Sequence, residues 1–167
     1  IYPRLMGFIK TWFNSQNDSD QDGFPEWQHP YQIGLDAIPL YHSWLPGSQG
    51  VDPRAVESPA LAAFLFSECQ SLSRMAALLN KAVDQTWHKQ ISNRLRELVE
   101  SQWDSTFNSY LYRDTVTHQH LPGVSLFSFR GSGKQTLDYS LEPAQRLLVR
   151  IKTSDEKTRQ THITIHG

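Results

Sequence analysis

The chain has 167 residues, of which 38% are apolar and 20% charged, so it can bury a hydrophobic core. Its 16 basic and 17 acidic residues leave a formal net charge of −1, which offers no basic field to nucleic acid. The longest apolar runs are too short to span a bilayer. We therefore expect neither a nucleic-acid partner nor a membrane partner. The single cysteine, Cys69, excludes an internal disulfide and is predicted to be a buried, inert thiol.

The first predicted element is a helix over residues 3–13. Its apolar residues recur at intervals of three and four, which places them on one helix face: Leu5, Phe8, Ile9 and Trp12. A polar turn follows at residues 14–17. A second helical segment, over residues 35–44, is short and is interrupted by Pro39, so we expect a broken helix or an entry turn there.

Two longer helices are predicted next. In the first, over residues 58–79, Ser58 is suited to the N-cap and Pro59 to the first turn, and leucines recur at helical spacing along its length. The second, over residues 85–102, carries apolar residues on one side and charged residues on the other, with Asp84 as its expected N-cap.

The hydrophobic period changes after Trp103 and becomes typical of strands. Predicted strands are residues 110–113, 124–129, 147–152 and 162–166. We therefore predict a mostly α chain with a helical domain over residues 1–120 and the start of a β-rich accessory domain over residues 121–167. Because packed segments reach both ends of the sequence, we also expect the chain to be a fragment of a longer parent chain.

The most specific motif is an acidic loop in which Asp18, Asp20 and Asp22 alternate before Gly23. This alternation directs carboxylates toward one point, as in short loops that bind Ca²⁺ through oxygen ligands. The twelfth position from Asp18 is His29 rather than glutamate, which excludes an EF-hand. The alternative is a solvated turn whose aspartates bond their own backbone amides. The pair His118-x-His120 is more typical of a surface turn than of a metal site.

The acidic loop resembles that of six-hairpin, (α/α)6-barrel glycoside hydrolases of the glycogen-debranching, amylo-α-1,6-glucosidase type. The matching residues run from Asp18 to Trp27, continue with Gly34, Leu35 and Asp36, and reach Trp44. A later hairpin end, residues 103–113 (WDSTFNSYLYR), is also similar. The resemblance covers roughly residues 8–115. It implies a partial (α/α)6 toroid and hydrolysis of an α-glucan or a related oligosaccharide.

Glycoside hydrolysis needs one carboxyl group to protonate the leaving oxygen and a second, ionised one. The resemblance places Asp36 at the position of the catalytic acid, and its alternative role is to cap the following helix. Glu57 is a second catalytic candidate, which can equally be explained as favouring the helix N-terminus that follows it. Trp27 and Trp44 are candidates for stacking on a sugar ring, although large aromatic residues are also efficient core fillers.

Three functions therefore remain open. The first is a fragment of a glycoside hydrolase. The second is a non-catalytic, Ca²⁺-stabilised carbohydrate-binding or scaffold module, which predicts sugar affinity without turnover. The third is a helical interaction domain that binds neither metal nor sugar.

Overall fold

The computed structural model describes residues 1–34, 38–42, 50–120, 124–131, 133–140, 142, 146–149, 151 and 164–165. In the described part of the chain, three α-helices dominate: α1 (Tyr2–Thr11), α2 (Pro59–Leu78) and α3 (Ala82–Ser101). The remaining elements are short, namely η1 (Pro30–Ile33), η2 (Pro53–Ala55), β1 (Val56–Glu57), β2 (Trp103–Asp104), β3 (Ser109–Tyr110) and β4 (Arg113–Asp114). The predicted mostly α fold is confirmed.

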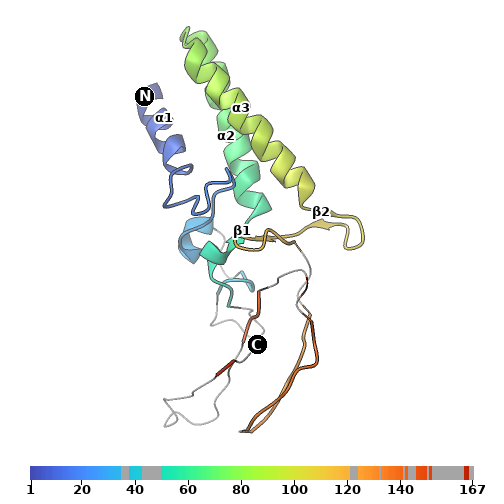
Figure 1. Ribbon diagram of the computed structural model, residues 1–167. Coiled ribbons are helices and arrows are strands. Elements are labelled where there is room, and N and C mark those ends of the chain that lie inside the picture. Colours follow the sequence, from blue (N-terminus) through green and yellow to red (C-terminus); the bar gives the residue numbers. More distant parts are fainter. Residues whose placement is uncertain are drawn as a thin grey trace.

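Helices α2 and α3 form an antiparallel hairpin and lie side by side along their length (Figure 1). The turn between them depends on Asn80, whose φ of 56° is left-handed. That conformation lets the amide of Lys81 donate to the carbonyl of Ala76 at 2.8 Å and closes the end of α2. A short connection of this kind forces the two helices to run in opposite directions.

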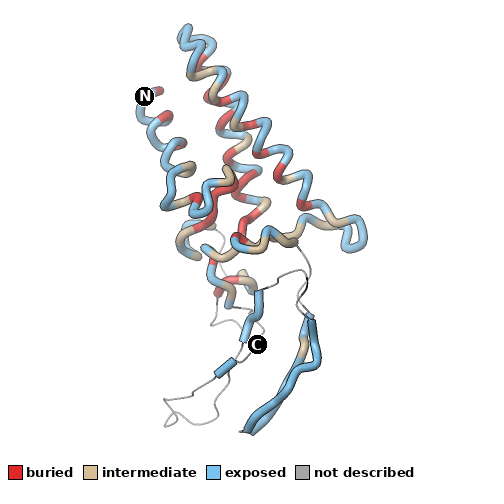
Figure 2. The backbone as a smooth tube through the Cα atoms, viewed as in Figure 1, coloured by how far each residue is buried: buried red, intermediate tan, exposed pale blue. Residues whose placement is uncertain are grey.

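The hydrophobic core lies where α1 and α3 meet α2. Helix α1 contributes Tyr2, Met6 and Ile9, which are one helical turn apart, and all three are buried. The predicted face is therefore wrong at Leu5 and Phe8, which are exposed. The buried residues of α2 follow the same spacing: Leu61, Leu65, Cys69, Leu72 and Ala76. Burial raises the pKa of the Cys69 thiol to about 12, as expected of the inert thiol that was predicted. Figure 2 shows these buried positions concentrated between the helices and in the loop beneath them.

The helix boundaries agree with the predicted ones to within three residues, but one predicted cap is wrong. Helix α3 begins at Ala82 with Lys81 at the N-cap, so Asp84 lies inside the first turn. There the Asp84 carboxylate accepts a hydrogen bond from the Tyr2 hydroxyl at 3.2 Å. Asp84 therefore joins α3 to α1 instead of capping α3. Ser58 does occupy the N-cap of α2, although its side chain makes no capping hydrogen bond.

The strands form two small antiparallel pairs. Strand β1 pairs with β4, which sets Glu57 opposite Arg113, and β2 pairs with β3. Among the described residues after Asp114 no strand is assigned, including residues 124–129. The expected strands at 147–152 and 162–166 lie partly outside the described residues, and the domain boundary at residue 120 stays a prediction. Half of the expected segment 35–44, residues 35–37 and 43–44, also lies outside them, and residues 39–41 form a turn. Within the described part of the chain, no helix is long and apolar enough to cross a membrane.

Candidate functional site

The acidic loop is held by hydrogen bonds from its own backbone. The Asp18 carboxylate accepts from the Gly23 amide at 3.1 Å, Asp20 from the Asp22 amide at 3.3 Å, and Asp22 from the Phe24 amide at 2.8 Å. Gly23 has a φ of 88°, a left-handed conformation that disfavours other residues. The backbone-bonded turn foreseen as an alternative is therefore present. It leaves one oxygen of Asp18, Oδ1, buried without a partner.

Arg113 connects this loop to strand β1. Its Nε donates to Oε2 of Glu57, and its Nη2 donates to Oδ2 of Asp22. The guanidinium also lies over the ring of Phe24, 5.4 Å from the ring centroid. The β1–β4 register explains the first of these contacts, because Arg113 and Glu57 are directly opposed on neighbouring strands. One side chain thus joins three segments that are far apart in the sequence.

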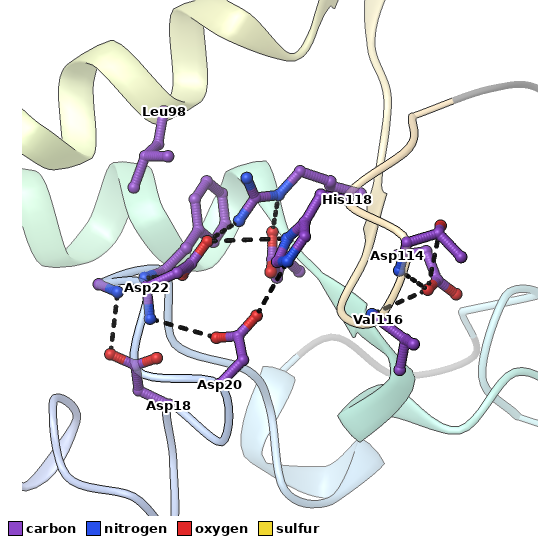
Figure 3. Close-up of polar contacts among 12 residues, drawn as sticks. Asp18, Asp20, Asp22, Leu98, Asp114, Val116 and His118 are labelled. Carbon is purple, nitrogen blue, oxygen red and sulfur yellow. Dashed lines mark hydrogen bonds and ion pairs between the residues drawn. The ribbon is translucent and has the colours of Figure 1, made fainter. Parts of the chain in front are cut away.

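His118 completes the cluster from the turn that follows β4. Asp114 organises this turn, since its carboxylate accepts from the amides of Val116 and Thr117 at 2.9 Å each. His118 has a left-handed φ of 54°. Its Nε2 lies 3.8 Å from Oδ2 of Asp20, and its Nδ1 lies 3.9 Å from Oδ2 of Asp22. Figure 3 shows both carboxylates directed toward the imidazole ring.

Two fully buried glutamates lie next to each other behind the loop. Glu26 and Glu57 form an isolated antiparallel bridge. Burial raises the pKa of Glu26 to about 7, although its carboxylate accepts from the Ser19 amide and hydroxyl, each at 3.3 Å. Burial likewise raises the pKa of Glu57 to about 8, against the lowering effect of Arg113. Oε1 of Glu57 is buried and has no hydrogen-bond partner.

These pKa values predict how stability depends on pH. The folded state holds the protons of Glu26 and Glu57 more tightly than the unfolded chain, where the pKa of glutamate is about 4.3. Stability is therefore fully present below that pKa, and the free energy of unfolding is expected to fall as pH rises toward about 8. Urea unfolding at several pH values, in the presence of a chelator, measures this dependence.

Two single variants are compared. Glu57→Gln is the test, and Glu97→Gln is the control, because it changes the same residue type at an exposed position on α3. We expect Glu57→Gln to flatten the fall in stability with pH, and Glu97→Gln to leave it unchanged. Equal slopes in the two variants would contradict the raised pKa of Glu57.

The structure separates the predicted site residues into three groups. Asp20, Asp22 and Glu57 come together, whereas Asp36 and Trp44 lie outside the described residues. Trp27 is buried and packs edge-to-face on Trp12 with ring centroids 5.6 Å apart, which is the core role left open for it. Glu57 has no exposed surface, so its carboxyl cannot reach a substrate in this conformation.

Sequence reasoning missed Arg113 as a partner of the loop and set His118 aside. Neither residue stands in a local pattern that signals the role. The hydrogen bonds of Arg113 join residues 91 and 56 positions apart, a separation that no spacing rule covers. The available signal was the hairpin end at residues 103–113, whose resemblance pointed to this part of the chain without giving a role to Arg113.

The cluster has the oxygen-rich composition of a site for a hard divalent cation. Asp20, Asp22, Glu57 and His118 each offer one ligand atom, and these atoms all lie within 4.8 Å of one another. Two buried carboxylate oxygens, on Asp18 and Glu57, lack any partner. Carboxylate oxygens are the ligands that Ca²⁺ prefers. The residues present therefore fit such an ion, with Glu57 and His118 added to two of the three predicted aspartates, Asp20 and Asp22, whereas Asp18 is not part of the cluster.

The segment that leads to Asp36 begins with a closed turn. His29 caps η1 through a reciprocal arrangement in which its imidazole accepts from the Tyr31 amide at 3.2 Å and its own amide donates to the Gln32 side chain at 3.1 Å. Gly34 ends η1 with a left-handed φ of 69°. The backbone is therefore fixed as far as two residues before Asp36.

The resemblance of the acidic loop suggested a glycoside hydrolase, and the comparison with protein families gives the same class. Residues 1–131 match the family described as the mannosylglycerate hydrolase MGH1-like glycoside hydrolase domain, and the chain belongs to that family. This membership confirms the suspected six-hairpin glycoside hydrolase class. No curated protein and no solved structure matches the chain.

Proposed function

We propose that this chain forms part of an enzyme that hydrolyses the glycosidic bond of an α-glucan or a related oligosaccharide by carboxylate acid/base catalysis. The observation that carries the proposal is the family match over residues 1–131, which includes the acidic loop and Asp36. In this proposal Asp36 is the acid that protonates the leaving oxygen. We expect the second carboxylate to come from the remainder of the parent chain, in an (α/α)6 toroid.

The fixed turn before Asp36 supports this role. A catalytic acid must be held within hydrogen-bond reach of the leaving oxygen, so the backbone that carries it must be ordered. The capped η1 turn and the left-handed Gly34 provide such an anchor immediately before it. Glu57 has no catalytic role in this proposal, because its side chain is fully buried and bonded to Arg113.

The proposal is tested by measuring turnover in the full-length protein that contains the chain. The substrates are a short α-glucan and mannosylglycerate, the glycoside in the family description. We expect one of them to be hydrolysed to a single anomer, which nuclear magnetic resonance of the fresh product identifies. Sugar binding without turnover would instead establish the carbohydrate-binding or scaffold alternative. If the protein neither binds nor hydrolyses a sugar, the helical interaction domain is the remaining alternative.

We further propose that the acidic loop binds Ca²⁺ in a structural role. Asp20 and Asp22 would hold the ion together with Glu57 from β1, whose Oε1 has no partner. Asp18, the third aspartate of the motif, would join them through its own unpartnered Oδ1. When bound, the ion would supply the positive charge that these carboxylates need. It would thereby join the loop to β1, close to the start of the segment that carries Asp36.

A further inference from the structure

Arg113 occupies the place that a counter-ion would take among the carboxylates. Its side chain is 14% exposed, and its two bonded partners, Asp22 and Glu57, are 20% and 0% exposed. A guanidinium presents its donors in a planar fork, which suits two carboxylates approached from one edge. Both oxygens of Asp22 are thereby bonded, since its Oδ1 accepts from the Phe24 amide and its Oδ2 from Arg113.

The guanidinium nevertheless leaves oxygens without partners. It bonds only Oε2 of Glu57, so Oε1 stays buried and unpartnered, as does Oδ1 of Asp18. A buried carboxylate oxygen without a partner is costly, and a six- to eight-coordinate cation can bond several such oxygens at once. The same carboxylates therefore suit two counter-ions, the attached guanidinium and a divalent cation.

We infer that Arg113 is a built-in competitor of the divalent cation, and that cation binding displaces its guanidinium from Asp22 and Glu57. This inference rests on the proposed Ca²⁺ site. The two positive groups would lie on the same carboxylates, Asp22 and Glu57, even where the ion bonds the oxygen that Arg113 leaves free, and they repel each other at close range. Each binding event must then break the Arg113 contacts, which lowers the apparent affinity for the ion.

The displacement also couples the ion to the segment that Arg113 belongs to. Arg113 is in β4, and the turn that carries His118 follows directly. Release of the guanidinium removes the Arg113 link between β4 and the acidic loop, which leaves the weaker contacts of His118 and the backbone pairing of β1 with β4. Cation occupancy would thus set how tightly residues 113–118 are held against the loop.

The test is calorimetric titration of CaCl₂ into the chain and into two variants. Arg113→Gln removes the competitor, and we expect it to bind Ca²⁺ about tenfold more tightly or better. Arg94→Gln is the matched control, because Arg94 contacts the same loop but donates to the backbone carbonyl of Asp22 at 3.3 Å. We expect its affinity to change by much less, since it holds no carboxylate oxygen.

The outcomes separate this inference from the proposed Ca²⁺ site. If neither the unmodified chain nor either variant binds Ca²⁺, the proposed site is wrong, and so is the competition by Arg113. If all three bind equally, or both variants gain alike, the site stands and competition by Arg113 is wrong. Weaker binding by Arg113→Gln would also overturn the inference, because Arg113 would then be supporting the site.

A second measurement needs no variant and covers the case in which Arg113→Gln does not fold. The Nε–H resonance of Arg113 is followed by ¹H–¹⁵N spectroscopy in the unmodified chain as Ca²⁺ is added. We expect the resonance to move to the position of a solvent-exposed arginine and to exchange rapidly with water. A resonance unmoved at saturating Ca²⁺ would show that the guanidinium stays on its carboxylates.

Discussion

Replacing Asp36 with asparagine in the full-length protein is expected to lower kcat about 100- to 10,000-fold. The amide has the shape of the carboxyl group but cannot donate its proton to the leaving oxygen, and general acid catalysis typically contributes a factor of that size. The change leaves the charge of the acidic loop intact, so we expect the melting temperature to change little. The measurement is turnover of the substrate identified for the wild type, together with its thermal unfolding.

The choice of leaving group makes the Asp36 prediction specific. The variant should hydrolyse a glycoside whose leaving group needs no protonation, such as a dinitrophenyl glycoside, with a much smaller loss of rate. The control is Asp52→Asn, which removes an exposed carboxylate paired with Arg54. Equal rate losses for good and poor leaving groups would contradict the role of Asp36 as the acid.

Removing Arg113 should produce the largest change in stability. Arg113→Met leaves the fully buried Glu57 and the partly buried Asp22 without their counter-ion. Breaking a buried ion pair from one side typically costs about 3–5 kcal/mol. Arg113 lowers the pKa of Glu57, so its removal raises that pKa beyond about 8. We expect a loss of that size in the free energy of unfolding, measured with a chelator, at a pH well above 8 where the Glu57 carboxyl is ionised. Below that pH the loss should be smaller, because Glu57 can take up a proton instead.

The matched control for this prediction is Arg54→Met. Arg54 and Asp52 form an ion pair whose side chains are 63% and 47% exposed, so its loss should change the free energy of unfolding very little. A double variant, Arg113→Met with Glu57→Gln, should recover part of the stability, because no buried charge is then left alone. A loss in Arg113→Met as small as that in Arg54→Met would show that Arg113 is not the counter-ion of Glu57.

The two Arg113 experiments address different properties of the same contact. The stability measurement is made without Ca²⁺ and reports what the guanidinium contributes when it is the available cation. The calorimetric titration reports how much Ca²⁺ affinity is lost because the ion must displace the guanidinium. If Arg113 both stabilises the free chain and weakens Ca²⁺ binding, the two cations are alternatives at one set of carboxylates.

Local sequence determined the helices and the conformation of the acidic loop. Apolar residues at helical spacing predicted α1, α2 and α3, because one face of each helix must be buried. The alternating aspartates before Gly23 predicted a Ca²⁺-binding loop with a backbone-bonded turn as the alternative, and that turn is present, since short acidic side chains can bond amides two residues on. The resemblance of the same loop identified the glycoside hydrolase class, which the family match confirms.

Only the tertiary structure decided which residues share the site. The pairing of β1 with β4 brings Arg113 to Glu57, and the following turn brings His118 to Asp20 and Asp22. Both are long-range contacts between elements of two residues, which are too short for any periodicity to reveal. Burial decided the roles of the remaining candidates. Trp27 lies in the core and Glu57 is inaccessible, because neighbouring elements cover them. Sequence alone could not choose between these roles and contact with a sugar.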